Sequence, residues 1–165
     1  MTLSIVSFLL ARFPMAAPAQ THGGAHAQPQ AEWSLAEAPM KRMLKERIMA
    51  ELNKAADTDG PPVTGAARVK FVRLNASGSR TGIEVRAPNE WCGATGNCED
   101  WIFDSKTGNL LVKGDGWDYV FHRATHHGLF DFSVRLNMSA FSGTITEYQF
   151  DGNVYQEVDS KEETY

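Results

Sequence analysis

The sequence predicts an α+β protein in which one N-terminal amphipathic helix packs on a mainly antiparallel sheet of about seven short strands. A single segment, residues 39–54, has the periodicity of a helix. The chain after Pro62 instead alternates polar and apolar residues in short runs that turn residues separate. No second helix falls between these runs, which favours antiparallel pairing over the βαβ units of a parallel sheet. With 165 residues and 42% hydrophobic content, the chain suits one globular domain with some non-globular sequence.

The N-terminal segment predicts export. Residues 3–11 form an apolar run that is shorter than the roughly 20 residues a membrane-spanning helix needs. Ala17 and Ala19 provide the small side chains that a signal peptidase accepts. We therefore expect a signal peptide over residues 1–19, although no basic residue precedes the apolar run; a buried N-terminal strand or helix is the alternative. Residues 20–33 are rich in Gly, Ala, Gln and Pro and predict a flexible leader.

The predicted helix has a capping signal and one apolar stripe. Ser34 and Glu37 have the spacing of a capping box, and Pro39 suits the first position of the regular helix. The stripe recurs every four residues and consists of Met40, Leu44, Ile48 and Leu52, with Met43 beside it. It fits packing against the protein's own sheet; a partner-binding or membrane-surface face is the alternative. Gly60 and the two prolines after it end the helix.

Short alternating runs after the helix predict the strands. They cover residues 69–74, 82–87, 101–103, 110–112, 117–122, 130–136 and 145–150, with a returning strand that starts at residue 154. Turns are expected between them, at 76–80, 104–109 and 114–116. Asp151 and Gly152 are the strongest hairpin signal, because Gly tolerates the positive φ of a tight turn. These elements make residues 34–158 a single domain, followed by a polar C-terminal tail over 159–165.

The two cysteines, Cys92 and Cys98, leave three chemical interpretations. Five residues separate them and no second Cys pair exists, so a structural zinc site would need histidines from elsewhere in the chain. A catalytic thiol needs a base nearby, and no local motif provides one. Two intervening glycines let the loop fold back within disulfide range, and an even number of cysteines suits an exported chain. We therefore expect a disulfide, which would hold Trp91 and Trp101 at the two ends of one turn.

Other candidate site residues are histidines and tryptophans. The densest polar cluster comprises His122, His126, His127 and Asp131. These side chains could supply an acid–base pair or a His/carboxylate metal set, whereas loop histidines are more often exposed or locally hydrogen-bonded. The tryptophans that are candidates for a binding surface are Trp91, Trp101 and Trp117. Aromatic residues serve binding surfaces, but they also build ordinary β cores.

Charge and motif content argue against several function classes. The net charge of −4 disfavours a nucleic-acid partner, which normally requires a basic face. The sequence lacks the calcium-loop, dinucleotide-binding, P-loop, nucleophile-elbow and H-E-x-x-H patterns. We therefore assign no catalytic residue, no metal and no cofactor. No later apolar run has membrane-spanning length, so no integral span is expected after signal cleavage.

Three motifs resemble those of a family of small, uncharacterised bacterial secreted or periplasmic proteins. That family carries a C-G-x-G-x-C turn, a G-aromatic-x-D stretch and a C-terminal Y-x-F-D-G-x-x-Y hairpin. This chain has a turn one residue longer at 92–98, the second motif with its aromatic displaced by one at 128–131, and the third in full at 148–155. The resemblance covers about residues 88–158. It implies a compact, β-rich exported domain and no known activity.

The predicted function is that of a secreted or periplasmic bacterial binding or accessory module. Its partner would be an envelope or extracellular protein, which it could inhibit. The absence of a catalytic motif and the stapled turn favour this interpretation. The alternative is a His- and Asp-dependent hydrolase or a metal-dependent enzyme that uses residues 122–131. A structural envelope component without a discrete ligand is a third hypothesis.

Overall fold

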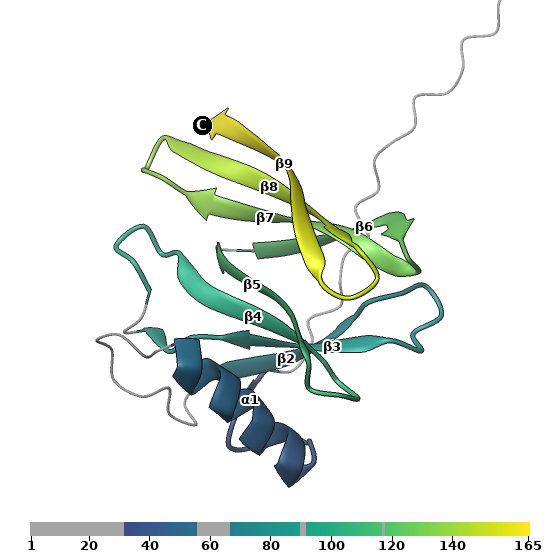
Figure 1. Ribbon diagram of the computed structural model, residues 1–165. Coiled ribbons are helices and arrows are strands. Elements are labelled where there is room, and N and C mark those ends of the chain that lie inside the picture. Colours follow the sequence, from purple (N-terminus) through teal and green to yellow (C-terminus); the bar gives the residue numbers. More distant parts are fainter. Residues whose placement is uncertain (1–31, 56–66, 90–91, 117) are drawn as a thin grey trace, which may run out of the picture.

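The protein folds into three layers, with a helix, a first sheet and a second sheet stacked in that order (Figure 1). The computed structural model describes residues 32–55, 67–89, 92–116 and 118–165. Its elements, in chain order, are β1 (Trp33–Ser34), α1 (Arg42–Ala55), β2 (Arg68–Arg73), β3 (Thr81–Arg86), β4 (Cys98–Asp104), β5 (Leu110–Gly116), β6 (Asp118–His126), β7 (Leu129–Asn137), β8 (Ser142–Phe150) and β9 (Tyr155–Thr164).

Strands β1 to β5 form the first sheet, in which each strand pairs antiparallel with its neighbour in sequence. Successive side chains alternate between the two faces of this sheet. One face meets α1 through a core that includes Val69, Ile83, Val85, Trp101 and Phe103. Ile48 and Leu52 of α1 are fully buried in the same core. The predicted packing of the helix stripe on the protein's own sheet is therefore confirmed.

Strands β6 to β9 form the second sheet, again with antiparallel neighbours throughout. A second core fills the space between the two sheets. Phe132 of β7 lies at its centre. The rings around it, at centroid distances of 4.7 to 5.4 Å, belong to Tyr119, Phe121, Tyr148 and Tyr155. This aromatic cluster holds the second sheet together and closes it onto the first.

The prediction of about seven strands in one sheet is wrong, because the described residues form nine strands in two sheets. The chain leaves the first sheet at Gly116 and enters the second at Asp118. Gly116 lies against Val134 of β7, and a Cβ at position 116 would collide with the Val134 side chain. This close approach packs the end of β5 across β7, and β5 does not pair with β6. The turn expected at 114–116 is accordingly the end of β5.

Helix α1 begins at Arg42 rather than at the expected Pro39. One contact of the predicted capping box forms, since the Glu37 N–H donates to Ser34 Oγ at 3.3 Å; the Glu37 carboxylate accepts from the Ser34 hydroxyl at 2.7 Å. They belong to a separate turn, which the Ala38 N–H closes onto the Ser34 carbonyl at 2.9 Å. Pro39 has no N–H, so the hydrogen-bond ladder of α1 starts beyond it.

Strands extend past both expected margins of the domain. Trp33, expected in the leader, belongs to β1, and residues 159–164, expected as a polar tail, form the second half of β9. The predicted hairpin at Asp151 and Gly152 joins β8 to β9. The expected signal peptide over 1–19 lies outside the described residues. Within the described ranges, no helix is long and apolar enough to cross a membrane.

Candidate functional site

Cys92 and Cys98 form a disulfide, as the sequence predicts, with their Cα atoms 4.1 Å apart. The chain has no other cysteine, so no free thiol remains for zinc binding or catalysis. Cys98 is the first residue of β4 and lies opposite Gly116 of β5. The disulfide loop therefore lies at the end of β4, beside the end of β5 where the chain crosses to the second sheet.

The disulfide loop is clamped to the second sheet by Asn97. The Asn97 side-chain amide donates to the Asn137 carbonyl at 2.7 Å, and its oxygen accepts from the Asn137 N–H at 2.9 Å. The Asn137 side chain also donates to the carbonyl of Thr95 at 3.4 Å. The Asn97 amide thus pairs with the last residue of β7 as a neighbouring strand would. The loop links the two sheets, in addition to closing a local turn.

Three large apolar side chains are exposed beside this clamp, and we call them the aromatic end. They are Met138, Phe141 and Tyr165, which are 61%, 74% and 55% exposed. Met138 and Phe141 lie in the turn between β7 and β8, and Tyr165 directly follows β9. Exposed large apolar residues that gather at one end of a molecule mark an interaction surface more often than scattered ones do.

Hydrogen bonds hold the aromatic end in one shape. The Phe141 N–H donates to Ser139 Oγ at 3.1 Å, and the Tyr165 N–H donates to the Phe141 carbonyl at 2.9 Å. The Tyr165 ring stacks under the Arg135 guanidinium at 5.6 Å from the ring centroid. It covers Gly143, where any Cβ would collide with the Tyr165 hydroxyl. The Tyr165 ring and the backbone of Phe141 are therefore held in place.

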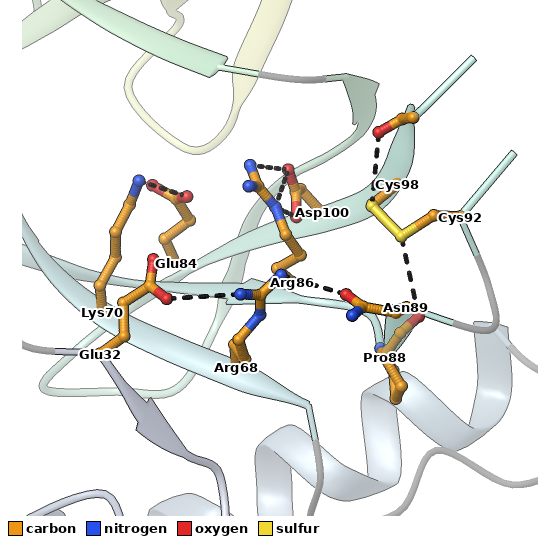
Figure 2. Close-up of polar contacts among 11 residues, drawn as sticks. Glu32, Arg68, Lys70, Glu84, Arg86, Pro88, Asn89, Cys92, Cys98 and Asp100 are labelled. Atoms are coloured by element: carbon orange, nitrogen blue, oxygen red, sulfur yellow. Dashed lines mark hydrogen bonds and ion pairs between the residues drawn. A yellow bond between two sulfur atoms is a disulfide. The ribbon is translucent and has the colours of Figure 1, made fainter. Parts of the chain in front are cut away.

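A cluster of buried charges lies on the face of the first sheet that turns away from α1 (Figure 2). The cluster consists of Lys70, Glu84, Arg86 and Asp100. Lys70 on β2 forms an ion pair with Glu84 on β3 at 2.8 Å. Arg86 on β3 donates hydrogen bonds of 2.9 to 3.2 Å to the Asp100 carboxylate on β4. The carboxylates are 3% and 0% exposed, whereas the Lys70 and Arg86 side chains are 27% and 24% exposed. The two cations thus cover the two acids.

Burial raises the pKa of Asp100 to about 6, even though the hydrogen bonds and charge of Arg86 act in the opposite direction. The nearby Glu84 carboxylate adds to the increase. Loss of water around a fully buried carboxylate therefore outweighs its ion pair with Arg86. Buried ion pairs of this kind contribute little net stability, because desolvation offsets the attraction between the charges.

Tyr119 of β6 brings a phenol to the same cluster. Its side chain is buried, and its hydroxyl has no hydrogen-bond partner among the described residues. Burial raises the pKa of Tyr119 well above its ordinary value, and Asp100 and Glu84 raise it further. A Cβ at Gly114 would lie 3.4 Å from the Tyr119 hydroxyl oxygen, so this glycine leaves room for the phenol. The cluster is thus a contact between the two sheets.

The predicted histidine cluster does not form one site. His122 contacts Glu147 on β8 at 3.2 Å. His126 instead lies at the end of β6, where its Nδ1 meets the buried Asp131 carboxylate at 2.8 Å. His127 occupies the hairpin turn with a φ of 48°. No three His, Cys, Asp or Glu side chains of the described ranges converge on a position that could hold a metal.

Neither the predicted tryptophans nor a groove that lies beside α1 contributes a binding site together with the other predicted residues. Trp101 is only 1% exposed and packs in the core under α1, so it presents no surface to a partner. Trp91 and Trp117 lie outside the described residues. The groove has a volume of about 500 Å³ and no predicted site residue lines it. Its walls are formed by Leu35, Ala36, Arg42, Lys45, Glu46, Met49, Ala50 and Asn53.

The aromatic end and the charge cluster are both absent from the sequence-based candidates. Apolar Met138 and Phe141 in a turn between two strands were a usable signal, since such turns are normally polar. The cluster was hidden because alternation on a strand assigns its polar positions to solvent. Only the pairing register brings Arg86 opposite Asp100.

No protein-family model, curated protein or solved structure matches this chain. The family resemblance drawn from the three sequence motifs therefore stays a prediction.

Proposed function

We propose that the protein is a secreted or periplasmic bacterial binding module that acts on another protein through its aromatic end. The observation that carries this proposal is the exposure of Met138, Phe141 and Tyr165 in a rigid setting next to the disulfide loop. Aromatic residues and Met are enriched at protein interfaces, and aromatic anchors carry much of the binding energy there.

Rigidity supports this proposal. A partner that binds Tyr165 and Phe141 does not have to order the Tyr165 ring or the Phe141 backbone first, which lowers the entropic cost of association. Arg135, the cation that stacks on Tyr165, adds a residue type that is common among binding hot spots. The clamp between Asn97 and Asn137 keeps the disulfide loop beside these side chains.

Export is proposed on two grounds. The first is the signal-like start of the sequence at residues 1–19. The second is the disulfide between Cys92 and Cys98, which suits an oxidising compartment. An accessory or inhibitory role toward an envelope or extracellular protein fits both. Detection of an exported chain that begins at Gln20 would support this location, and retention of residues 1–19 would contradict it.

Site-specific cross-linking tests the binding function. The full chain carries photo-reactive benzoyl-phenylalanine at position 141, or at Met43 as a control with similar exposure on α1. Irradiation in envelope extracts is expected to yield a discrete adduct only from position 141. Excess unlabelled protein should compete for the adduct, and its Phe141→Ala variant should not. Identical adducts from both positions, or equal competition by the variant, would refute the proposal.

A His- and Asp-dependent enzyme is the second candidate, and the His126–Asp131 pair favours it. Asp131 orients the imidazole through Nδ1 at 2.8 Å, while the His126 side chain is 47% exposed. A general base needs such an orientation. Hydrolysis of ester or peptide substrates that disappears in His126→Ala, but persists in His122→Ala, would support this candidate over a binding module.

A further inference from the structure

We infer that the outer edge of β9, with which no described strand pairs, accepts an extended segment of a partner protein, and that this segment carries Lys or Arg on one face. The inference rests on the proposed binding function and names the chemistry of the partner. The edge leads directly into Tyr165, so it is continuous with the aromatic end.

Strand β9 (Tyr155–Thr164) is the outer strand of the second sheet and pairs with β8 alone among the described strands (Figure 1). Residues 156 to 162 are all exposed. An open edge of this length offers unpaired N–H and C=O groups, and a partner chain can use them to add a strand.

The register shows which backbone groups face the open edge. The Tyr165 N–H donates to the Phe141 carbonyl at 2.9 Å, which makes this a hydrogen-bonded pair. Hydrogen-bonded and non-hydrogen-bonded pairs alternate along an antiparallel ladder. Counting back from Tyr165 to the register shift at Glu147, the backbone groups of β9 that point away from β8 belong to Ser160, Glu162 and Thr164. Beyond the shift, counting forward from the hydrogen-bonded pair of Asp151 and Val154 adds Glu157. The outward direction of the Ser160 N–H is consistent with its hydrogen bond, which goes to the Asp159 carboxylate at 3.0 Å and not to β8.

The charges along β9 favour a basic partner. Asp159 is 3.5 Å from Lys161, and Glu163 is 3.0 Å from Arg135. The acids of β9 that form no ion pair within the described ranges are Glu157 and Glu162. They face Tyr148 and Thr144, which are four residues apart on β8, so both acids lie on one face of the sheet. If a partner strand pairs with β9 in the same register spacing as β8, its side chains opposite Glu157 and Glu162 are four residues apart along the partner.

A second copy of this chain is a poor occupant of the same edge. Two β9 strands placed side by side would bring their acidic rows together, and like charges on neighbouring strands destabilise the pairing. Asp159 limits the edge further, because its carboxylate occupies the Ser160 N–H. The open backbone groups continue on both sides of Ser160, at Glu157 and from Glu162 to Thr164 beside the aromatic end.

A peptide titration tests the inference on the full chain. The probe is acetyl-Thr-Lys-Thr-Thr-Val-Lys-Thr-Thr-amide with a fluorophore, and the control probe has Glu in place of both Lys residues. Two cross-strand ion pairs are expected to make the Lys probe bind about tenfold more tightly. Glu157→Lys with Glu162→Lys should reverse the preference. Glu46→Lys is the control: it makes the same acid-to-base change on an exposed face of α1 and should leave the preference for the Lys probe unchanged.

Backbone pairing needs its own variants. Glu162→Pro removes an N–H that faces the open edge, while the bonds between β8 and β9 remain. It is expected to abolish binding without altering the near-ultraviolet circular dichroism of the protein. Asp159→Ala frees the Ser160 N–H and should strengthen binding.

Three outcomes would overturn the inference. The first is equal affinity for both probes, and the second is full binding by Glu162→Pro. The third is a dimer in sedimentation that Glu162→Pro dissociates, which would assign the edge to a second copy. Failure of the proposed function gives a different result: cross-linking from position 141 then yields no specific adduct, while the peptide titration still shows the preference for the Lys probe.

Discussion

Asp100→Asn tests the energetic role of the buried charge cluster. The Asp100 carboxylate is fully buried and hydrogen-bonded to Arg86, and its pKa is about 6. The unfolded chain returns it to the ordinary value of 3.8. The folded protein therefore binds this proton more tightly than the unfolded chain, and its stability through Asp100 increases as the pH falls below 6.

The magnitude follows from the difference between the two pKa values. Each unit corresponds to about 1.4 kcal/mol, so Asp100 alone raises the free energy of unfolding by about 2 to 3 kcal/mol between pH 7.5 and pH 4. Asn cannot ionise, so this contribution disappears in Asp100→Asn. At pH 7.5 the variant is expected to be at least as stable as the wild type.

Urea denaturation, followed by tryptophan fluorescence at several pH values, measures the effect. The stability advantage of Asp100→Asn should shrink by about 2 to 3 kcal/mol as the pH falls from 7.5 to 4. Glu46→Gln removes an exposed carboxylate and serves as the control, with no comparable pH-dependent difference expected. A pH-independent difference between Asp100→Asn and the wild type would refute the reasoning. So would a large loss of stability at pH 7.5, since it would show that the Arg86 ion pair outweighs desolvation.

Three further predictions concern the packing between the sheets. Phe132→Ala opens a cavity at the centre of the aromatic cluster and should cost about 3 to 5 kcal/mol in thermal or urea unfolding; a loss under 1 kcal/mol would show that the cluster does not hold the sheets together. Asn97→Ala leaves the Asn137 N–H without its partner and should cost about 1 to 3 kcal/mol, with faster hydrogen exchange at Asn137; unchanged exchange would contradict the clamp. Cys92→Ser with Cys98→Ser should lose about 2 to 2.5 kcal/mol, because the cross-linked loop is short; the absence of a two-hydrogen mass shift on reduction of the wild type would contradict the disulfide.

Local patterns were sufficient for the elements and insufficient for their assembly. The helix stripe, most strands and the Asp151 hairpin follow from periodicity and turn residues, which are properties of neighbouring residues in sequence. Trp101 shows the limit. Its place at the end of the disulfide turn made it a candidate for a binding surface, but its position in the alternation along β4 points its side chain into the core under α1. Residues 159–164 show another limit, since a polar strand at a sheet edge has the composition of a tail.

The sequence by itself indicated which segments become the helix and most of the strands, that its two cysteines are able to form a disulfide, and which residues can turn. Each depends on side chains a few positions apart. Only the tertiary structure decided that the strands divide into two sheets at Gly116, that Asn97 clamps the disulfide loop to Asn137, and that Arg86 shields Asp100 between the layers. These features depend on strand register and on close approach between distant segments. A one-residue change of register would turn the same side chains to the opposite face, and local periodicity does not choose between such registers.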